Sequence, residues 1–214
     1  MFIDRIDAGL QLADALKAFQ GKDAVLLAIP RGGVPVAAEA ARALHLPLDI
    51  LLTKKIGHPH QPELAIGAVS LQGLRIEPSF HVPRAYIDAE AERIRGVLRE
   101  RESSYRSGRP PLIVKGRTAI IVDDGIATGS TVRAAIDLMR QAGAQRVVVA
   151  VPVAAAQTVE QLKELADEVI CVEAPDDLYA IGAHYEDFAQ TSDEEVIALL
   201  DEAARRGSRT PQRR

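Results

Sequence analysis

The sequence predicts an α/β fold, in which an open, mainly parallel, twisted sheet is flanked by helices and carries a small cap. Short runs of β-branched and aliphatic residues recur along the chain. Most of these runs are apolar on both faces, as strands covered on both sides of a sheet must be. Amphipathic helical patterns separate them, and such an alternation joins parallel strands through right-handed crossovers.

Six runs are predicted to be strands of the fold. They are residues 24–29, 48–53, 64–69, 118–123, 146–151 and 168–173. The core that they form must be aliphatic, because hydrophobic residues make up 47% of the chain whereas aromatic residues make up only 4% and tryptophan is absent.

Helices are expected where apolar residues recur at helical spacing. A helix begins near Ser130, since Val132, Ile136 and Met139 share one face. A long helix lies within residues 71–117, and its apolar stripe consists of Ile87, Ala91, Ile94 and Leu98. A final helix is expected at about residues 192–204.

The domain organisation follows from length and from breaks in this rhythm. The 214 residues suit one large domain, which we place at residues 1–204. Residues 71–117 and 174–190 interrupt the alternation and are predicted to form a small cap over the ligand-binding edge of the sheet. Residues 205–214 are rich in arginine without an apolar pattern, so we expect a disordered basic tail.

Composition argues against several classes of protein. The formal net charge of -4 and the pI near 5.8 do not favour a nucleic-acid partner. The single cysteine, Cys171, allows no internal disulfide and fits a reducing cytosol. The chain has neither an apolar signal core nor the run of roughly 20 apolar residues that spans a membrane. We therefore expect a cytoplasmic protein.

Ligands of open α/β sheets bind at the carboxyl ends of the strands. Three loops follow such ends: PRGGVP at residues 30–35, KKIGHPHQPE at residues 54–63, and DGIATGST at residues 124–131. The two prolines of the second loop suggest an irregular segment, and His58 and His60 are expected at the polar rim of the site.

The third loop has the composition of an anion cradle. Gly125 and Gly129 permit tight or left-handed backbone and allow a ligand to approach the main chain. The start of the following helix offers free N–H groups and a partial positive charge, which suit a phosphate monoester. The residues expected to hold the phosphate are Ala127, Thr128, Gly129, Ser130 and Thr131.

Two adjacent carboxylates, Asp123 and Asp124, precede this cradle. An acid beside a phosphate site accepts hydrogen bonds from ribose hydroxyls in dinucleotide sites. A pair of acids suits a vicinal diol, or a diol that also holds Mg²⁺. The two features together predict a ribose 5-phosphate site.

The segment IIVDDGIATGST, residues 120–131, resembles the phosphoribosyl-pyrophosphate (PRPP) motif of the type I phosphoribosyltransferases. Residues 28–51 resemble the pyrophosphate loop and following helix of the purine-type members, and YAIGAHYEDF, residues 179–188, is similar to their hood. The whole chain is most similar to a bacterial group of predicted phosphoribosyltransferases whose substrates are generally unassigned.

This resemblance implies an enzyme that uses PRPP and Mg²⁺, with Asp123, Asp124 and Arg31 in catalytic roles. Asp123 and Asp124 would hold the diol and, largely through ligand and water, the metal. Arg31, Gly32 and Gly33 would bind pyrophosphate, with a non-proline cis peptide between Pro30 and Arg31. Either Lys54 or Lys55 would also reach the pyrophosphate.

The resemblance also places Tyr179 where purine-type relatives stack an aromatic ring on the base. The chain departs from the 6-oxopurine enzymes at two points. Ala127 replaces the acid that is proposed as their general base, and VPVAAAQ, residues 151–157, lacks their lysine for the purine carbonyl. The nitrogenous acceptor therefore stays open, as do a homodimer and, in place of catalysis, a regulatory PRPP or nucleotide sensor.

Overall fold

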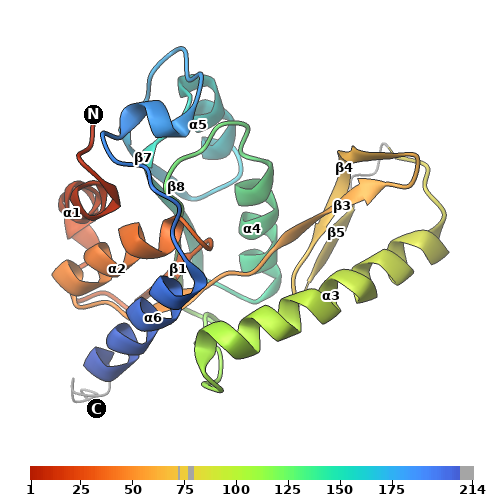
Figure 1. Cartoon of the computed structure of the whole chain (residues 1–214), viewed down its shortest axis with the longest axis horizontal. Coiled ribbons are helices and arrows are strands. Elements are labelled where there is room, and N and C mark those ends of the chain that lie inside the picture. The colour runs from red at the N-terminus through yellow and green to blue at the C-terminus, as the bar shows by residue number, and fades with distance from the viewer. Residues whose placement is uncertain (72, 77–79, 208–214) are drawn as a thin grey trace.

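The main sheet of the computed structural model has five parallel strands in the order β2-β1-β6-β7-β8 (Figure 1). The structure describes residues 1–71, 73–76 and 80–207. The strands of this sheet are β1 (Ala24–Ala28), β2 (Leu48–Ile50), β6 (Thr118–Val122), β7 (Arg146–Val153) and β8 (Glu168–Glu173). The arrangement confirms the predicted fold class.

Helices cover both faces of this sheet. One face packs against α1 (Arg5–Ala15), α2 (Gly33–Leu44) and α6 (Asp193–Gly207), and the other packs against α4 (Ser130–Gln141) and α5 (Ala156–Lys163). Alternate residues of β1 enter the two cores, so that Leu26 lies in one and Leu27 in the other. All five residues of β1 are buried, which explains why its sequence shows no polar face.

A second, antiparallel sheet combines with a long helix to form what we call the arm. Its strands pair in the order β3-β4-β5, and its helix projects with them from one side of the main sheet (Figure 1). The elements of the arm are β3 (Lys54–His58), β4 (Gln61–Val69), β5 (Leu74–Ile76) and α3 (Arg84–Arg106). The predicted stripe of α3 is buried, where Ile87 and Ile94 share a core with Ile56 and Ile66 of the sheet.

Three predictions about this region were wrong. Residues 64–69 belong to the antiparallel sheet instead of the main sheet, the strand predicted at 48–53 ends at Ile50, and residues 54–63 form most of a hairpin instead of an irregular loop. The pairing register of β3 and β4 shifts at Gly57, so the two strands remain paired although this segment contains Pro59 and Pro62. A Cβ atom there would lie 2.4 Å from the Pro62 carbonyl oxygen, so only glycine permits this close pairing.

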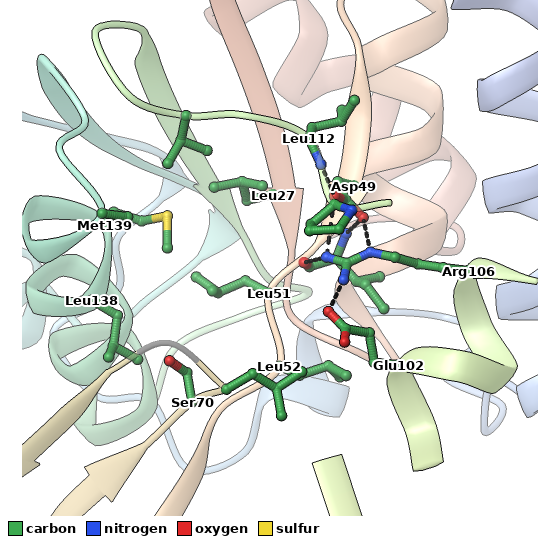
Figure 2. Close-up of a pocket in the computed structure, with 15 residues that line it drawn as sticks. Leu27, Asp49, Leu51, Leu52, Ser70, Glu102, Arg106, Leu112, Leu138 and Met139 are labelled. Carbon is green, nitrogen blue, oxygen red and sulfur yellow. Dashed lines mark hydrogen bonds and ion pairs between the residues drawn. The ribbon is translucent and has the colours of Figure 1, made fainter. Parts of the chain in front are cut away.

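A buried ion pair attaches the arm to the main sheet (Figure 2). Arg106, near the end of α3, donates from Nε to Asp49 Oδ1 at 2.9 Å and from Nη2 to Asp49 Oδ2 at 3.1 Å. The Leu112 N–H donates to Asp49 Oδ2 at 2.8 Å. A single carboxylate on β2 therefore holds both the end of α3 and the segment by which the chain returns to the sheet.

The same pair borders a cavity of about 170 Å³ between the arm and the main sheet (Figure 2). Its lining includes Leu27 of β1, Leu138 and Met139 of α4, and the loop residues Leu51, Leu52 and Leu112. Leu138 and Met139 lie in the second half of α4, whereas the predicted phosphate site lies at the first turn of that helix. The cavity thus belongs to the packing of the arm and not to the ligand-binding edge.

Two terminal features complete the fold. The final helix, α6, includes residues 205–207, which the sequence predicts to be part of the tail. The rest of that tail lies outside the described residues. Residues 174–190, here called the hood, contain the short helix η2 (Ile181–His184) and pack against Phe2. No helix in the described ranges is both long and apolar enough to cross a membrane.

Candidate functional site

The first and third predicted loops touch each other at the carboxyl ends of neighbouring strands. The pairing of β1 with β6 sets Ala28 beside Val122, so the residues that follow these strands diverge from a common point. A Cβ atom on Gly33 would lie 2.9 Å from Asp123 Cα, and one on Gly32 would lie 1.9 Å from Asp124 Oδ2. Both glycines therefore lie directly against the acid pair, which consists of Asp123 and Asp124, and a side chain at either position would displace part of that pair.

The phosphate loop, residues 125–131, presents unpaired donors. Gly129 caps α4 at a φ of 74°, and no side chain caps that helix end. Within the described part of the chain, the backbone N–H groups of residues 127–131 have no acceptor. The Thr158 hydroxyl holds the loop from behind by donating to the Ala127 carbonyl oxygen at 2.7 Å. This arrangement leaves the helix N-terminus open toward an anion.

The acid pair is held in a fixed orientation. The Asp124 N–H donates to Asp123 Oδ1 at 2.9 Å. The Tyr185 hydroxyl donates to the Asp124 carbonyl oxygen at 2.6 Å, and burial raises the pKa of Tyr185, so this donor keeps its proton at neutral pH. Burial, together with the charge of Asp124, raises the pKa of Asp123 well above its usual range.

Arg5 binds the second acid from the N-terminal end of α1. Its Nε and Nη2 lie 2.9 and 2.8 Å from Asp124 Oδ2, and its Nη1 donates to the Ala189 carbonyl oxygen at 2.6 Å. Sequence reasoning missed both Arg5 and Tyr185. The sequence near Arg5 shows only that Asp4 suits the N-cap of a helix. A helix cap does not indicate that Arg5 binds Asp124, which lies 119 residues later.

Lys54 and Lys55 begin β3 and point to opposite faces of the arm sheet. Lys55 pairs with Ala68, which pairs in turn with Arg75, and Arg75 forms an ion pair with Asp137 of α4. This row of side chains thus faces α4. Both lysines, with Ser130 and Thr131, are among the residues that line a groove of about 440 Å³.

The geometry of Arg31 partly matches expectation. The Pro30–Arg31 peptide bond is cis, which confirms that prediction. The guanidinium is about one-third exposed, and its Nη1 lies 3.7 Å from Asp193 Oδ1 at the start of α6. The loop backbone therefore contacts the acid pair, whereas the Arg31 side chain reaches toward α6.

The hood rests on the beginning of the phosphate loop. A Cβ atom on Gly125 would lie 2.5 Å from the Ile181 side chain. Tyr179, two residues earlier, is 95% exposed, and its proposed stacking on a base stays a prediction. His58 and His60 are expected at the site rim, but His58 ends β3, His60 lies in the turn before β4, and neither is among the residues that line the groove.

Cys171 has no nucleophilic role in this geometry. It lies on β8 and its thiol donates to the Glu173 carbonyl oxygen at 3.0 Å. Burial raises its pKa to about 11, so the thiol stays protonated at neutral pH.

Comparison of the chain with known proteins identifies its family. A protein of Mycobacterium tuberculosis (strain H37Rv) named "Putative phosphoribosyl transferase" is 46% identical over 210 residues, which cover 96% of this chain and 47% of that protein. A protein of the same name from strain CDC 1551 matches equally. The chain thus spans about half the length of these curated relatives.

The crystal structure of TT1426 from Thermus thermophilus has the same fold as this chain. It superposes with a TM-score of 0.86 at 46% identity, covering 94% of this chain and 98% of that one. The model of the phosphoribosyl transferase domain matches residues 7–187, which include all three loops and the hood as far as Asp187. The chain belongs to the phosphoribosyl transferase domain family.

Proposed function

We propose that this chain binds PRPP at the carboxyl edge of its main sheet and, with Mg²⁺, transfers the 5-phosphoribosyl group to a nitrogenous acceptor with release of pyrophosphate. The contact of Gly32 and Gly33 with the acid pair carries this proposal. This contact supports the proposal because one ligand can then reach the candidate pyrophosphate loop, the candidate diol clamp and the candidate anion cradle together. A nucleoside monophosphate alone would leave the first of these unused.

The reaction forms a bond from the acceptor nitrogen to ribose C1 and breaks the bond from C1 to a pyrophosphate oxygen, which leaves with the electron pair. Positive charge develops on the ribose and negative charge on the leaving group, so the protein must stabilise both. The acid pair lies on the ribose side. Arg31 and a lysine supply cations on the pyrophosphate side, and the α4-facing row favours Lys55 over Lys54 for this role.

The acid pair fits a Mg²⁺ ion that is shared with the ligand. No group of three or more His, Cys, Asp or Glu side chains in the described ranges is arranged to hold a metal alone. Arg5 already occupies Asp124 Oδ2, so Asp124 Oδ1 and the Asp123 carboxylate are the oxygens of the pair that remain to hold the ion together with the ligand. When bound, Mg²⁺ would offset the negative charge that develops on the pyrophosphate.

Binding and turnover test the proposal separately. Calorimetry is expected to show PRPP binding in Mg²⁺ and much weaker binding in EDTA, and equal affinity in both would refute the metal-bridged ligand. A screen of nucleobases and small amines for pyrophosphate release then identifies the acceptor. Tight PRPP binding without release for any acceptor would favour the regulatory sensor over the enzyme.

A further inference from the structure

The guanidinium of Arg5 connects two parts of the candidate site that come from distant parts of the chain. Two of its N–H groups reach Asp124 Oδ2, and a third reaches the carbonyl oxygen of Ala189 at the end of the hood. The guanidinium also lies over the ring of Phe188, with Cζ 3.9 Å from the ring centroid. Three kinds of contact therefore fix this one side chain.

The Arg5–Asp124 ion pair is largely buried. The two side chains are only 12% and 14% exposed. Hydrogen bonds between charged groups in such surroundings are stronger than neutral ones and are screened less by solvent. The position of Arg5 is itself fixed, since Asp4 accepts hydrogen bonds from the N–H groups of Ile6 and Asp7, both at 2.8 Å.

The carboxylate that Arg5 binds lies against the pyrophosphate loop. A Cβ atom on Gly32 would meet Asp124 Oδ2 at 1.9 Å and Arg5 Nε at 3.2 Å. Asp124 Oδ2 is therefore enclosed by the guanidinium and the loop backbone. Both guanidinium contacts use this oxygen, so Oδ1 is the atom that Arg5 leaves for a ligand hydroxyl.

We propose that Arg5 is a positioning residue of the PRPP site, which holds Asp124 Oδ2 against Gly32 so that Oδ1 is presented to the ribose diol. This inference rests on the proposed function. Arg5 acts through Asp124 and does not touch the ligand. Its effect is therefore confined to ligands that contain the diol, whereas inorganic pyrophosphate, which lacks the diol, binds independently of Arg5.

The test compares three ligands with the full chain and its variants. Arg5→Met removes the charge but keeps a long apolar side chain over Phe188. It is expected to weaken PRPP and ribose 5-phosphate by roughly 10- to 100-fold, the loss of charge-assisted hydrogen bonds, and to change the pyrophosphate affinity less than about threefold. Arg5→Lys restores charge without the two-pronged contact, so its affinities fall between those of the wild type and Arg5→Met.

A double-mutant cycle separates positioning from direct contact and from loss of fold. If Arg5 acts through Asp124, adding Arg5→Met to Asp124→Asn causes little further loss of ribose 5-phosphate binding. Additive losses would overturn the proposal, as would equal losses for all three ligands. The matched control is Arg117→Met, which breaks the Arg117–Asp23 pair at the amino ends of β1 and β6, far from the candidate site. It is expected to leave all three affinities unchanged.

The wild type distinguishes this proposal from the proposed function. A wild-type chain that binds neither PRPP nor ribose 5-phosphate refutes the function itself. A wild-type chain that binds both, with Arg5→Met binding them equally well, refutes only the role of Arg5. Thermal unfolding of each variant completes the comparison, because a general loss of structure would lower the melting temperature together with every affinity.

Discussion

At the scale of single residues, Asp124 is held both at its side chain and at its backbone. Arg5 and the Gly32 backbone enclose one carboxylate oxygen, and Tyr185 binds the carbonyl oxygen of the same residue. The two acids were predictable from sequence because they follow a buried strand directly. Arg5 was not, since a pairing between residues so far apart in the chain leaves no local pattern.

Arg31→Ala separates the two halves of the ligand. Ribose 5-phosphate lacks the second anion, so its affinity is expected to stay unchanged. PRPP binding should fall roughly 10- to 150-fold, because a charge-assisted hydrogen bond is worth about 1.5–3 kcal/mol. Calorimetry with both ligands measures the difference.

Arg42→Ala, which removes an exposed arginine of α2 that pairs with Glu39, is the control and should alter neither affinity. If Arg31→Ala weakens both ligands equally, the pyrophosphate lies elsewhere.

At the scale of elements, those whose burial pattern is local in the sequence could be predicted, whereas those covered by distant parts of the chain could not. The start of α4 and the stripe of α3 were visible as local apolar periodicity, and Ile87, Ala91, Ile94 and Leu98 are all buried. The hairpin of β3 and β4 was not visible. Its apolar face is covered by α3, which comes later in the chain, and a register shift at Gly57 disguises its alternation.

The N-terminus of α4 gives a prediction for glycine. Gly129→Ala forces a side chain into the left-handed region and within 3.0 Å of the Thr158 methyl, so we expect a loss of about 1–2 kcal/mol in the free energy of unfolding. It should also weaken ribose 5-phosphate, because the cradle must shift. Denaturant unfolding and calorimetry give the two quantities.

Gly108→Ala is a matched control. Its φ of 77° carries the same backbone strain, but no atom lies within 4 Å of the added Cβ. It should lower stability similarly and leave ligand affinity intact. Equal losses of affinity in both variants would contradict the role of the phosphate loop.

The attachment of the arm gives a prediction for stability. Arg106→Met leaves Asp49 buried without its cation, which is expected to cost about 3–5 kcal/mol in urea unfolding. Arg84→Met breaks an exposed pair with Asp88 on the same helix and should cost less than about 1 kcal/mol. Similar losses in both variants would show that the buried pair does not hold the arm.

At the scale of the whole molecule, the fold class was predictable because strands buried on both faces must be apolar throughout. The proposed acceptor was not predictable, since its identity would depend on a few side chains around the hood and the phosphate loop. Ala127 at the cradle and VPVAAAQ, which begins near the end of β7, lack the acid and the lysine of 6-oxopurine enzymes. Tyr179 is exposed and offers only an aromatic face.

Hypoxanthine and guanine are therefore expected to be poor acceptors even when PRPP binds well. General acid–base assistance is typically worth about 10²–10⁴-fold, and the missing carbonyl partner removes further binding. Steady-state nucleotide formation with saturating PRPP and Mg²⁺ measures this, and PRPP affinity in the same preparation is the control. Turnover near the usual range of about 1–10³ per second would mean that other residues fill both roles.

The bridge made by Arg5 also has a consequence for the order of folding. Its partners Asp124 and Ala189 are separated from Arg5 by 119 and 184 residues of sequence. By contrast, β1 and α2 lie close together in sequence. Loop-closure entropy opposes contacts of long sequence separation, and the hood follows β8, the last strand of the main sheet in chain order. During synthesis, all five strands of the main sheet therefore emerge before the hood, whose Ala189 completes the contacts of Arg5. We expect the Arg5–Asp124 pair to gain its final geometry only after the hood has left the ribosome and packed against α1.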